Sequence, residues 1–477
     1  MTAPGPGVTD HSERLVRRNF LALGAGEAAA RLIAFGATVY VARTLGAGPY
    51  GVVGFALAIL LYLNYLADCG IETLGVREIA EDHERVHTMA PAVLTARIVA
   101  AAAIIVVVIP VALFLLPQPD GGVLAVYVLT LLALGGNTKW IHLGLERAGR
   151  VALARVLGES SMAVLVVLLV HSAADLGRVP LAQFSGDILA ALLLAFFLRR
   201  QGVSLRLRLD LRGALPVLRR SFPLAAHALL GLMIYNSDLI FLRGFRGAAE
   251  TGYYVAAYTL VSFLLNLGIA YSQSLLPTLH RLAPQPERQR ALYQTSMAQV
   301  FTAAFPVAVG GSLLSGGIIL LVFGPAFAAS AVALQILLWS IPVAFYRNVP
   351  QMALISAGRQ HTVLGITFVS ALLNLGLNLA VIPRWGMAGA AWATLGTEII
   401  RSSLALRYAA RAGFPLPALS RLWRPLVAGL VMGGVVFYAG RAGVLPGIGA
   451  GIAAYFVVLW LVGGIRVVAG ELPSLTV

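Results

Sequence analysis

Charged residues are scarce in this sequence, and cysteine is nearly absent. Only 12% of the 477 residues are charged, whereas soluble globular domains carry about 25%, so an ordinary soluble fold is excluded. The single cysteine, Cys69, excludes a disulfide within the chain and supplies no set of thiolate metal ligands. Long polar loops are missing too, so no connection could fold as a separate soluble domain. What is abundant is hydrophobic residues, at 59%, with a mean hydropathy of +0.85.

The hydrophobic residues form successive runs of about twenty, each long enough to cross the ~30 Å hydrocarbon layer as a helix. We therefore predict an all-α polytopic membrane protein with about fourteen transmembrane helices. The spans lie near 19–41, 51–70, 91–116, 122–143, 151–171, 180–199, 218–242, 250–275, 298–323, 327–356, 361–382, 387–409, 424–441 and 447–468. Residues 1–10 resemble a disordered polar tail. The first span shows no cleavage site, so we expect a retained helix rather than a removed signal peptide.

The same arrangement of spans occurs twice, in the same direction. An arginine pair stands at the beginning of the first and seventh spans, as RRNF at 17–20 and RRSF at 219–222. A Gly-Arg pair precedes the fifth and eleventh spans, at 149–150 and 358–359. We predict two parallel six-helix repeats related by a pseudo-two-fold axis along the membrane normal. The expected division is a cytoplasmic tail at 1–18, an N-lobe at 19–210, a C-lobe at 211–412 and two C-terminal helices at 413–477.

Positive charge is unevenly distributed over the predicted loops. Of the 35 basic residues, most lie in inward loops if the N-terminus is inside. The outward loops carry only Arg43, Arg178, Arg243, Arg246, Arg384 and Arg441. The positive-inside rule then places both termini in the cytoplasm. The net charge of +15 indicates this topology and an attraction to anionic membrane lipids. Nucleic acid is not an expected partner, because the arginines are dispersed over loops between spans.

Ionisable residues inside the predicted spans are the best candidates for function, since each costs a few kcal/mol at mid-bilayer unless it faces protein or water. Glu27 and Arg31 are one turn apart on the first span, so they share a face and can pair. The other candidates for a substrate-binding cavity are Lys139, Glu159, Asp238, Arg347, Glu398 and Arg401. One hydrated cavity between the two repeats is the simplest explanation for so many charges in spans.

Each of these charges also has a purely structural interpretation, as one half of an ion pair or as a side chain that extends to the interface. That interpretation is favoured for four residues near expected helix ends: Lys139, Glu146, Asp187 and Arg97. A role in the cavity is favoured for four residues farther from the ends: Arg31, Asp238, Arg347 and Glu398.

Short motifs accompany the spans at regular places. The first hairpin carries ARTLG at 42–46 and GPYG at 48–51, then DCGI at 68–71 and VREIA at 76–80. The seventh and eighth spans carry DLI at 238–240 and TGYYVAAY at 251–258, and the turn between spans eleven and twelve reads NLAVIPRWGMAGAA at 378–391. In order and spacing these motifs resemble the polysaccharide-export flippases of the multidrug/oligosaccharidyl-lipid/polysaccharide exporter superfamily. The resemblance covers spans one to twelve.

The resemblance implies a transporter of the bacterial cytoplasmic membrane and no enzyme. It would flip a polyprenyl-pyrophosphate-linked oligosaccharide from the inner to the outer leaflet, by alternating access of two lobes. Arg31 and Arg347 would contact the anionic head of this lipid, with Glu27 holding Arg31 in place. No cofactor is expected beyond a coupling ion, H+ or Na+. The expected partners are the lipid-linked glycan, membrane lipids, and the polymerase and glycosyltransferases of the same glycan.

Other functions stay open at this point. An ion-coupled multidrug exporter of the same superfamily would favour a cavity of carboxylates and aromatic residues, and a lipid II flippase would have the same architecture. A membrane polysaccharide polymerase or ligase is a more distant alternative, because the outward loops are only a few residues long. The sequence contains no Ser-His-Asp set, metal-ligand cluster or nucleotide-binding loop, so we predict no catalytic residues and no metal site.

Overall fold

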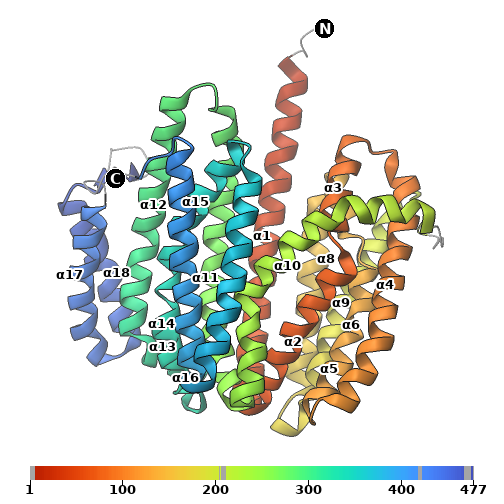
Figure 1. Ribbon diagram of the computed structural model, residues 1–477, viewed down its shortest axis with the longest axis horizontal. Coiled ribbons are helices and arrows are strands. Elements are labelled where there is room, and N and C mark those ends of the chain that lie inside the picture. Colours follow the sequence, from red (N-terminus) through yellow and green to blue (C-terminus); the bar gives the residue numbers. More distant parts are fainter. Residues whose placement is uncertain (1–5, 204, 206–210, 417–421, 467–473, 476–477) are drawn as a thin grey trace. The chain divides into compact units, whose positions relative to one another are not determined.

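The computed structural model describes residues 6–203, 205, 211–416, 422–466 and 474–475. These residues are almost entirely helical (Figure 1), apart from turns and a pair of two-residue antiparallel strands, β1 (Ile465–Arg466) and β2 (Ser474–Leu475). Twelve helices within these ranges are long and apolar enough to cross a membrane. Helices suit this environment because each satisfies its own backbone hydrogen bonds without water. The predicted class, an all-α polytopic membrane protein, is confirmed, and the number of about fourteen spans stays a prediction.

The chain divides into two compact units, unit 1 (Met1–Leu229) and unit 2 (Leu230–Val477). The boundary falls within helix α10 (Leu211–Arg246), so this helix contributes to both units. The predicted lobe limits at 210 and 412 and the superposition of the two lobes stay predictions.

Unit 1 consists of helices that pack along their lengths. Helix α8 lies beside both α1 and α9, and its 22 residues extend about 33 Å, enough to cross the hydrocarbon layer. The helices are α1 (Pro6–Leu45), α2 (Ala47–Asp68), α3 (Ile71–Glu81), α4 (Arg85–Leu115), α5 (Asp120–Val128), α6 (Thr130–Gly135), α7 (Lys139–Gly144), α8 (Ala148–Leu169), the 3-10 turn η1 (Ala173–Asp175) and α9 (Arg178–Arg199).

Helix α1 begins earlier than the sequence suggested. Residues 1–5 of the predicted disordered tail lie outside the described residues, but residues 6–10 are helical, so the prediction was wrong for them. Proline is well suited to the first helical position, because its missing N–H would have no partner there and its φ angle is already helical. The helix therefore extends well before the apolar run that begins near residue 19.

The predicted fourth span, 122–143, is not one continuous helix. It is divided into α5, α6 and α7, with the second break at residues 136–138. This break places the carbonyl groups of Leu134 and Asn137 beside Arg97 on α4, whose guanidinium donates to both at 3.1 Å. Backbone groups at membrane depth need such partners, because lipid offers none. Arg97 thus binds the backbone of the interrupted span, and its role in substrate binding stays untested.

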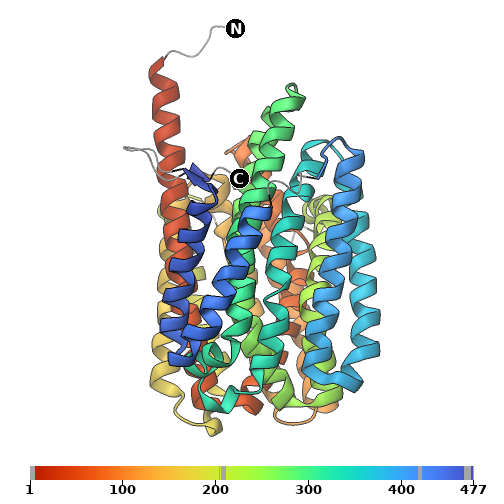
Figure 2. The same cartoon turned by 90° about the vertical axis from the view of Figure 1, so that its left-hand side faces the viewer.

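Unit 2 contains the remaining helices, and the last two, α17 and α18, run side by side as the blue pair in Figure 2. The buried residues Met432 and Tyr455 belong to the apolar core that joins this pair. After α10 the elements are α11 (Ala248–Arg281), α12 (Pro286–Leu313), α13 (Ser315–Val322), the 3-10 turn η2 (Pro325–Phe327), α14 (Ser330–Leu337), α15 (Ser340–Ser356), α16 (Gln360–Arg411), α17 (Trp423–Ala439), the 3-10 turn η4 (Gly440–Ala442) and α18 (Val444–Leu461).

Helix α16 is two helices joined at a sharp kink. Gly386 has a φ of +54° and a ψ of −135°, a conformation that only glycine adopts readily. Glu250, at the start of α11, accepts a hydrogen bond from the Met387 amide at 3.1 Å and another from Arg246 at 2.9 Å. The carboxylate therefore caps the N-terminus of the second segment, where the helix dipole favours negative charge. The kink lies at the turn predicted between spans eleven and twelve.

Replacing Gly386 with alanine is expected to lower the free energy of unfolding by about 1–3 kcal/mol. The backbone angle is unfavourable for any residue with a Cβ, and the added carbon would lie 2.9 Å from Cδ of Glu250. Melting of the purified protein in detergent measures the effect. The matched control is Gly396→Ala in the same helix, where an added Cβ meets nothing within 4 Å and alanine favours helix. Equal melting temperatures for the two variants would contradict the prediction.

Candidate functional site

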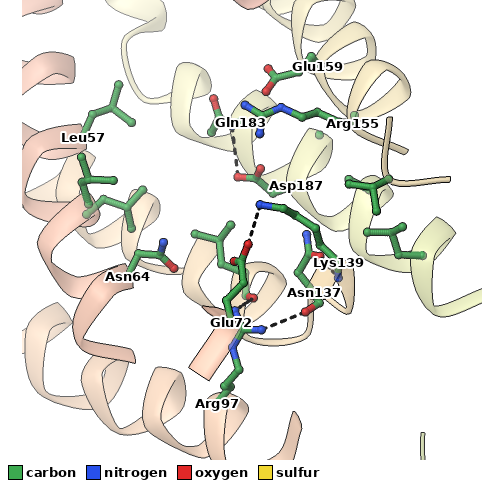
Figure 3. Close-up of a pocket in the computed structure, with 18 residues that line it drawn as sticks. Leu57, Asn64, Glu72, Arg97, Asn137, Lys139, Arg155, Glu159, Gln183 and Asp187 are labelled. Carbon is green, nitrogen blue, oxygen red and sulfur yellow. Dashed lines mark hydrogen bonds and ion pairs between the residues drawn. The ribbon is translucent and has the colours of Figure 1, made fainter. Parts of the chain in front are cut away.

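A pocket of about 460 Å³ lies within unit 1, among helices α2, α3, α4, α6, α7, α8 and α9. Charged side chains line it to an extent unusual for a membrane-spanning region (Figure 3). They are three acids and three bases: Glu72, Arg97, Lys139, Arg155, Glu159 and Asp187. Charges at this depth are tolerated only where they pair or face water. The pocket is therefore a polar site inside an apolar helical unit.

Ion pairs hold one end of this pocket. Lys139 Nζ lies 2.7 Å from Glu72 Oε1, and Arg97 Nη2 lies 3.2 Å from Asp68 Oδ1. Arg97 is buried, with 5% of its surface exposed, whereas about a third of the Lys139 side chain is exposed. Lys139 was a candidate for the cavity, although a structural interpretation was favoured for it. The structure places it on the pocket and pairs it with Glu72.

Glu27 connects helices α1 and α8. Arg31 Nε donates to its Oε1 at 2.8 Å, which confirms the predicted Glu27–Arg31 pair. Arg155 on α8 lies 3.3 Å from the other carboxylate oxygen. The sequence analysis did not identify Arg155, although its position four residues before Glu159 places both on one face of a helix. Each of these side chains is roughly a third exposed, so the pairs contribute little to stability.

Glu159 and Asp187 lie on two helices, α8 and α9, that approach each other closely at the pocket. Helix α8 meets α9 at Gly158 and Gly186, the residues just before these two acids. An added Cβ on Gly186 would lie only 2.6 Å from the carbonyl oxygen of Gly158, so the crossing requires glycine. Asp187 accepts a hydrogen bond from Gln183 at 3.2 Å. Asp187 was expected near a helix end, but its position on α9 places it on the pocket with Glu159.

Unit 2 contains a second group of charges, which is more deeply buried. Glu398 on α16 is fully buried and forms ion pairs with two arginines. Its Oε2 lies 3.0 Å from Arg347 Nε, and its Oε1 lies 3.3 Å from Arg401 Nη1. The hydroxyl of Tyr235 donates to Glu398 Oε1 at 2.8 Å, and Arg347 also donates to Gln351 Oε1 at 2.5 Å. Two arginines against one carboxylate leave a net positive charge. We name these five residues the arginine cluster.

A pocket of about 210 Å³ opens beside the arginine cluster, within unit 2. Its polar lining includes Tyr235, Asn236, Ser262, Arg347 and Asn348. Sequence reasoning had identified Arg347, Glu398 and Arg401 but not Tyr235 or Gln351. Gln351 stands four residues after Arg347 and was recognisable from helical spacing. Tyr235 comes from α10, and nothing in the local sequence links it to α16.

Asp238 does not join the arginine cluster. Its carboxylate is fully buried and accepts hydrogen bonds from the hydroxyl of Tyr254 and, at 3.4 Å, from that of Thr394. Asn374 and Asn378 form a neighbouring hydrogen-bonded group with Ser237. The candidates therefore form four local groups. Lys139 and Glu159 line the unit 1 pocket, Glu27 and Arg31 form a pair that Arg155 connects to it, three residues belong to the arginine cluster, and Asp238 stands by itself. Their role in binding substrate stays a prediction.

Comparison with known proteins identifies relatives for the chain. The model of a family described as "Polysaccharide biosynthesis protein" matches residues 16–283. A probable flippase, AglR of Haloferax volcanii, is 29% identical over 205 residues, which are 42% of this chain and 43% of that protein. A putative O-antigen transporter of Escherichia coli K12 is 23% identical over 273 residues, 55% of this chain and 64% of that protein. The chain thus matches less than two thirds of the length of either relative.

Solved structures with a similar fold include two transporters. The lipid II flippase MurJ in an inward closed conformation superposes with a TM-score of 0.77, covering 93% of this chain and 98% of that one. A multidrug resistance MATE family transporter of the MOP superfamily, inward-facing, has a TM-score of 0.65 and covers 80% and 94%. Both are 14% identical to this chain, so the similarity establishes a shared fold.

Proposed function

This chain belongs to the family of polysaccharide biosynthesis proteins, and we propose that it is a flippase for a lipid-linked oligosaccharide. Its substrate in this proposal is a polyprenyl-pyrophosphate-linked glycan, which moves from the inner to the outer leaflet of the bacterial cytoplasmic membrane. The names of its relatives, a probable flippase and a putative O-antigen transporter, support the proposal.

The observation that carries the proposal is the charged pocket of unit 1. A glycan and a pyrophosphate cannot cross hydrocarbon unaided, because each polar group would lose its hydrogen bonds to water. A transporter for such a head group needs polar surface at membrane depth, and the six charged side chains of the pocket provide it. A protein that only anchored or scaffolded other proteins would not need to maintain these charges in its spans.

In this proposal the arginines receive the anionic head of the lipid. Arginine is suited to the task because its planar fork binds phosphate oxygens in pairs. The Arg31 side chain is 38% exposed and bound through Nε to Glu27, which leaves its other nitrogens available for a ligand. Arg347 lines the unit 2 pocket, where the net positive charge of the arginine cluster favours an anion. No covalent step is needed.

Three further features belong to the proposal and rest on the sequence. The asymmetry of arginine over the loops supports cytoplasmic positions for both termini and for the linker at 199–220. Reporter fusions at Gly202, in the linker, and at the C-terminus should both give an inside signal. A coupling ion, H+ or Na+, would drive the cycle. Glycosyltransferases and a polymerase of the same glycan would be the partners. An outside signal from either fusion would contradict the orientation.

A vesicle assay tests the proposed function. The purified protein is reconstituted into liposomes that contain a polyprenyl-diphosphate-linked oligosaccharide, and external periodate, which does not cross the membrane, oxidises the accessible glycans. Without protein the glycans of the inner leaflet should stay protected, and with protein they should become oxidised. Export of a cationic dye by the same vesicles, without loss of protection, would instead favour a multidrug exporter.

The same assay separates a binding role of Arg31 from a structural one. Arg31→Lys keeps the positive charge but loses the fork, so the flipping rate should fall about tenfold or more while the amount of folded protein is unchanged. The control is Arg77→Lys on α3, where the arginine pairs with Glu81 on an exposed surface and should tolerate the change. A normal flipping rate for Arg31→Lys would remove Arg31 from the site.

A further inference from the structure

The two ends of the unit 1 pocket differ in charge. At the end near α3 and α7, Asp68 and Glu72 are matched by Arg97 and Lys139. At the end formed by α8 and α9, the two lining acids, Glu159 and Asp187, outnumber the one lining base, Arg155. We name this second end the α8–α9 face. Because its net charge is negative, it repels an anion and favours neutral or positively charged ligand groups.

We infer that the α8–α9 face is a saccharide subsite, at which Glu159 and Asp187 accept hydrogen bonds from the hydroxyl groups of neutral sugar units. The inference rests on the proposed flippase function and assigns one part of the substrate to one part of the molecule. It also predicts a preference: sugars without carboxylate groups should bind here better than uronic acids.

The hydrogen-bonding capacity of these carboxylates supports the assignment. Within the described part of the chain no group donates a hydrogen bond to Glu159, although the side chain is half-buried. Asp187 accepts one, from Gln183, through a single oxygen. An ionised carboxylate has about four acceptor positions. Both acids therefore keep acceptor positions that no described donor of the chain fills. Sugar hydroxyls supply such donors in adjacent pairs.

Arg155 does not donate a hydrogen bond to either acid among the described contacts. Its Nε lies 3.3 Å from Glu27, the acid that also binds Arg31, so Glu27 holds both bases. Glu159 stands one turn further along α8 than Arg155 and lines the pocket with it. Glu27 therefore pairs with both arginines, and the pocket acids Glu159 and Asp187 remain available to accept hydrogen bonds from a ligand.

The opposite wall of the pocket complements a sugar ring. Figure 3 shows Leu57 and Asn64 of α2 across the pocket from Gln183, Asp187 and Glu159. Leu60 and Leu61 continue the apolar side of α2. A sugar ring presents hydroxyl groups at its rim and C–H groups on its faces. The acids and Gln183 on α8 and α9 can bind the hydroxyl groups, and the leucines of α2 can pack against the C–H groups. The volume of about 460 Å³ is in the usual range for small-molecule sites.

Binding of three defined lipids tests the inference. The probes are a bare polyprenyl diphosphate, the same lipid carrying a neutral disaccharide of N-acetylhexosamine and hexose, and a version with a uronic acid in place of the hexose. Affinities for the intact purified protein are measured by native mass spectrometry. We expect the neutral glycolipid to bind about tenfold or more tightly than the other two, since a hydrogen bond to a charged group contributes that much.

Two variants locate the effect. Glu159→Gln and Asp187→Asn should each remove most of the advantage of the neutral glycolipid, and the loss should be confined to lipids that carry a glycan. The matched control is Glu81→Gln, which removes an exposed carboxylate of α3 outside the pocket and should keep the preference. Melting temperatures of all variants, measured without lipid, verify that each is folded.

Several results would overturn the inference. Wild-type protein that binds the neutral glycolipid no better than the bare lipid, or that prefers the uronic acid, has no such subsite, even if the vesicle assay shows flipping. Variants that weaken the binding of all three lipids equally would show that Glu159 and Asp187 contact the phosphates or only stabilise the fold. Variants that keep the full glycan preference would remove Glu159 and Asp187 from the subsite. Failure to bind any of the lipids, together with no flipping, would instead contradict the proposed function itself.

Discussion

Glu398→Gln should destabilise the protein by about 3–5 kcal/mol, the usual cost of removing one partner from a buried ion pair. Glu398 is fully buried, and its carboxylate is the shared partner of Arg347 and Arg401. Glutamine has nearly the same size as glutamate and can still accept the hydrogen bond from Tyr235, so the substitution removes little besides the negative charge. Two buried guanidinium groups would then repel each other without compensation. We expect little folded protein in the membrane and a large drop in melting temperature in detergent.

The same substitution on an exposed pair is the control. Glu81 lies 2.9 Å from Arg77 on the surface of α3, where an ion pair contributes less than about 1 kcal/mol. Glu81→Gln should therefore leave the melting temperature nearly unchanged. Adding Arg401→Met to Glu398→Gln removes one of the two repelling charges and should restore part of the stability. If Glu398→Gln were tolerated as well as Glu81→Gln, the arginine cluster would not be the buried network described above.

Gly186→Val should both destabilise unit 1 and abolish flipping. A Cβ at this position would lie 2.6 Å from the Gly158 carbonyl oxygen and 2.9 Å from Cβ of Met162, which is closer than atoms approach in folded proteins. Overpacking of this kind costs about 1–3 kcal/mol, because α8 and α9 must separate. Glu159 and Asp187 follow the two glycines directly, so the separation also moves both acids. Thermal melting and the vesicle assay measure the two effects.

Gly149 provides the control for a substitution in the same pair of helices. It lies in the first turn of α8, and an added Cβ there meets nothing within 4 Å. Gly149→Ala should keep the flipping rate and should not lower the melting temperature, since alanine favours helix over glycine. Wild-type melting and flipping by Gly186→Val would show that the helices do not cross as closely as the structure has them.

Features that depend on neighbours in the sequence were predictable. The Glu27–Arg31 pair followed from a spacing of four residues, which places two side chains on one helix face. Arg155 and Gln351 had the same kind of signal, since they stand four residues from Glu159 and Arg347. The division of the fourth span was missed for another reason: its hydropathy is continuous, and the break at residues 136–138 depends on Arg97 from a different helix.

Composition, hydropathy and motif order were enough to predict a helical membrane protein that resembles the polysaccharide-export flippases, with turns near its Pro and Gly motifs. Hydropathy and chain length suffice for that, because each span must satisfy its own backbone in lipid. Only the tertiary structure decided which charges meet. Glu398 binds Arg347, 51 residues away, and Tyr235, 163 residues away. Such contacts depend on how each helix is rotated against its neighbours, which is set by close glycine crossings and by the kink at Gly386 rather than by the periodicity of a single helix.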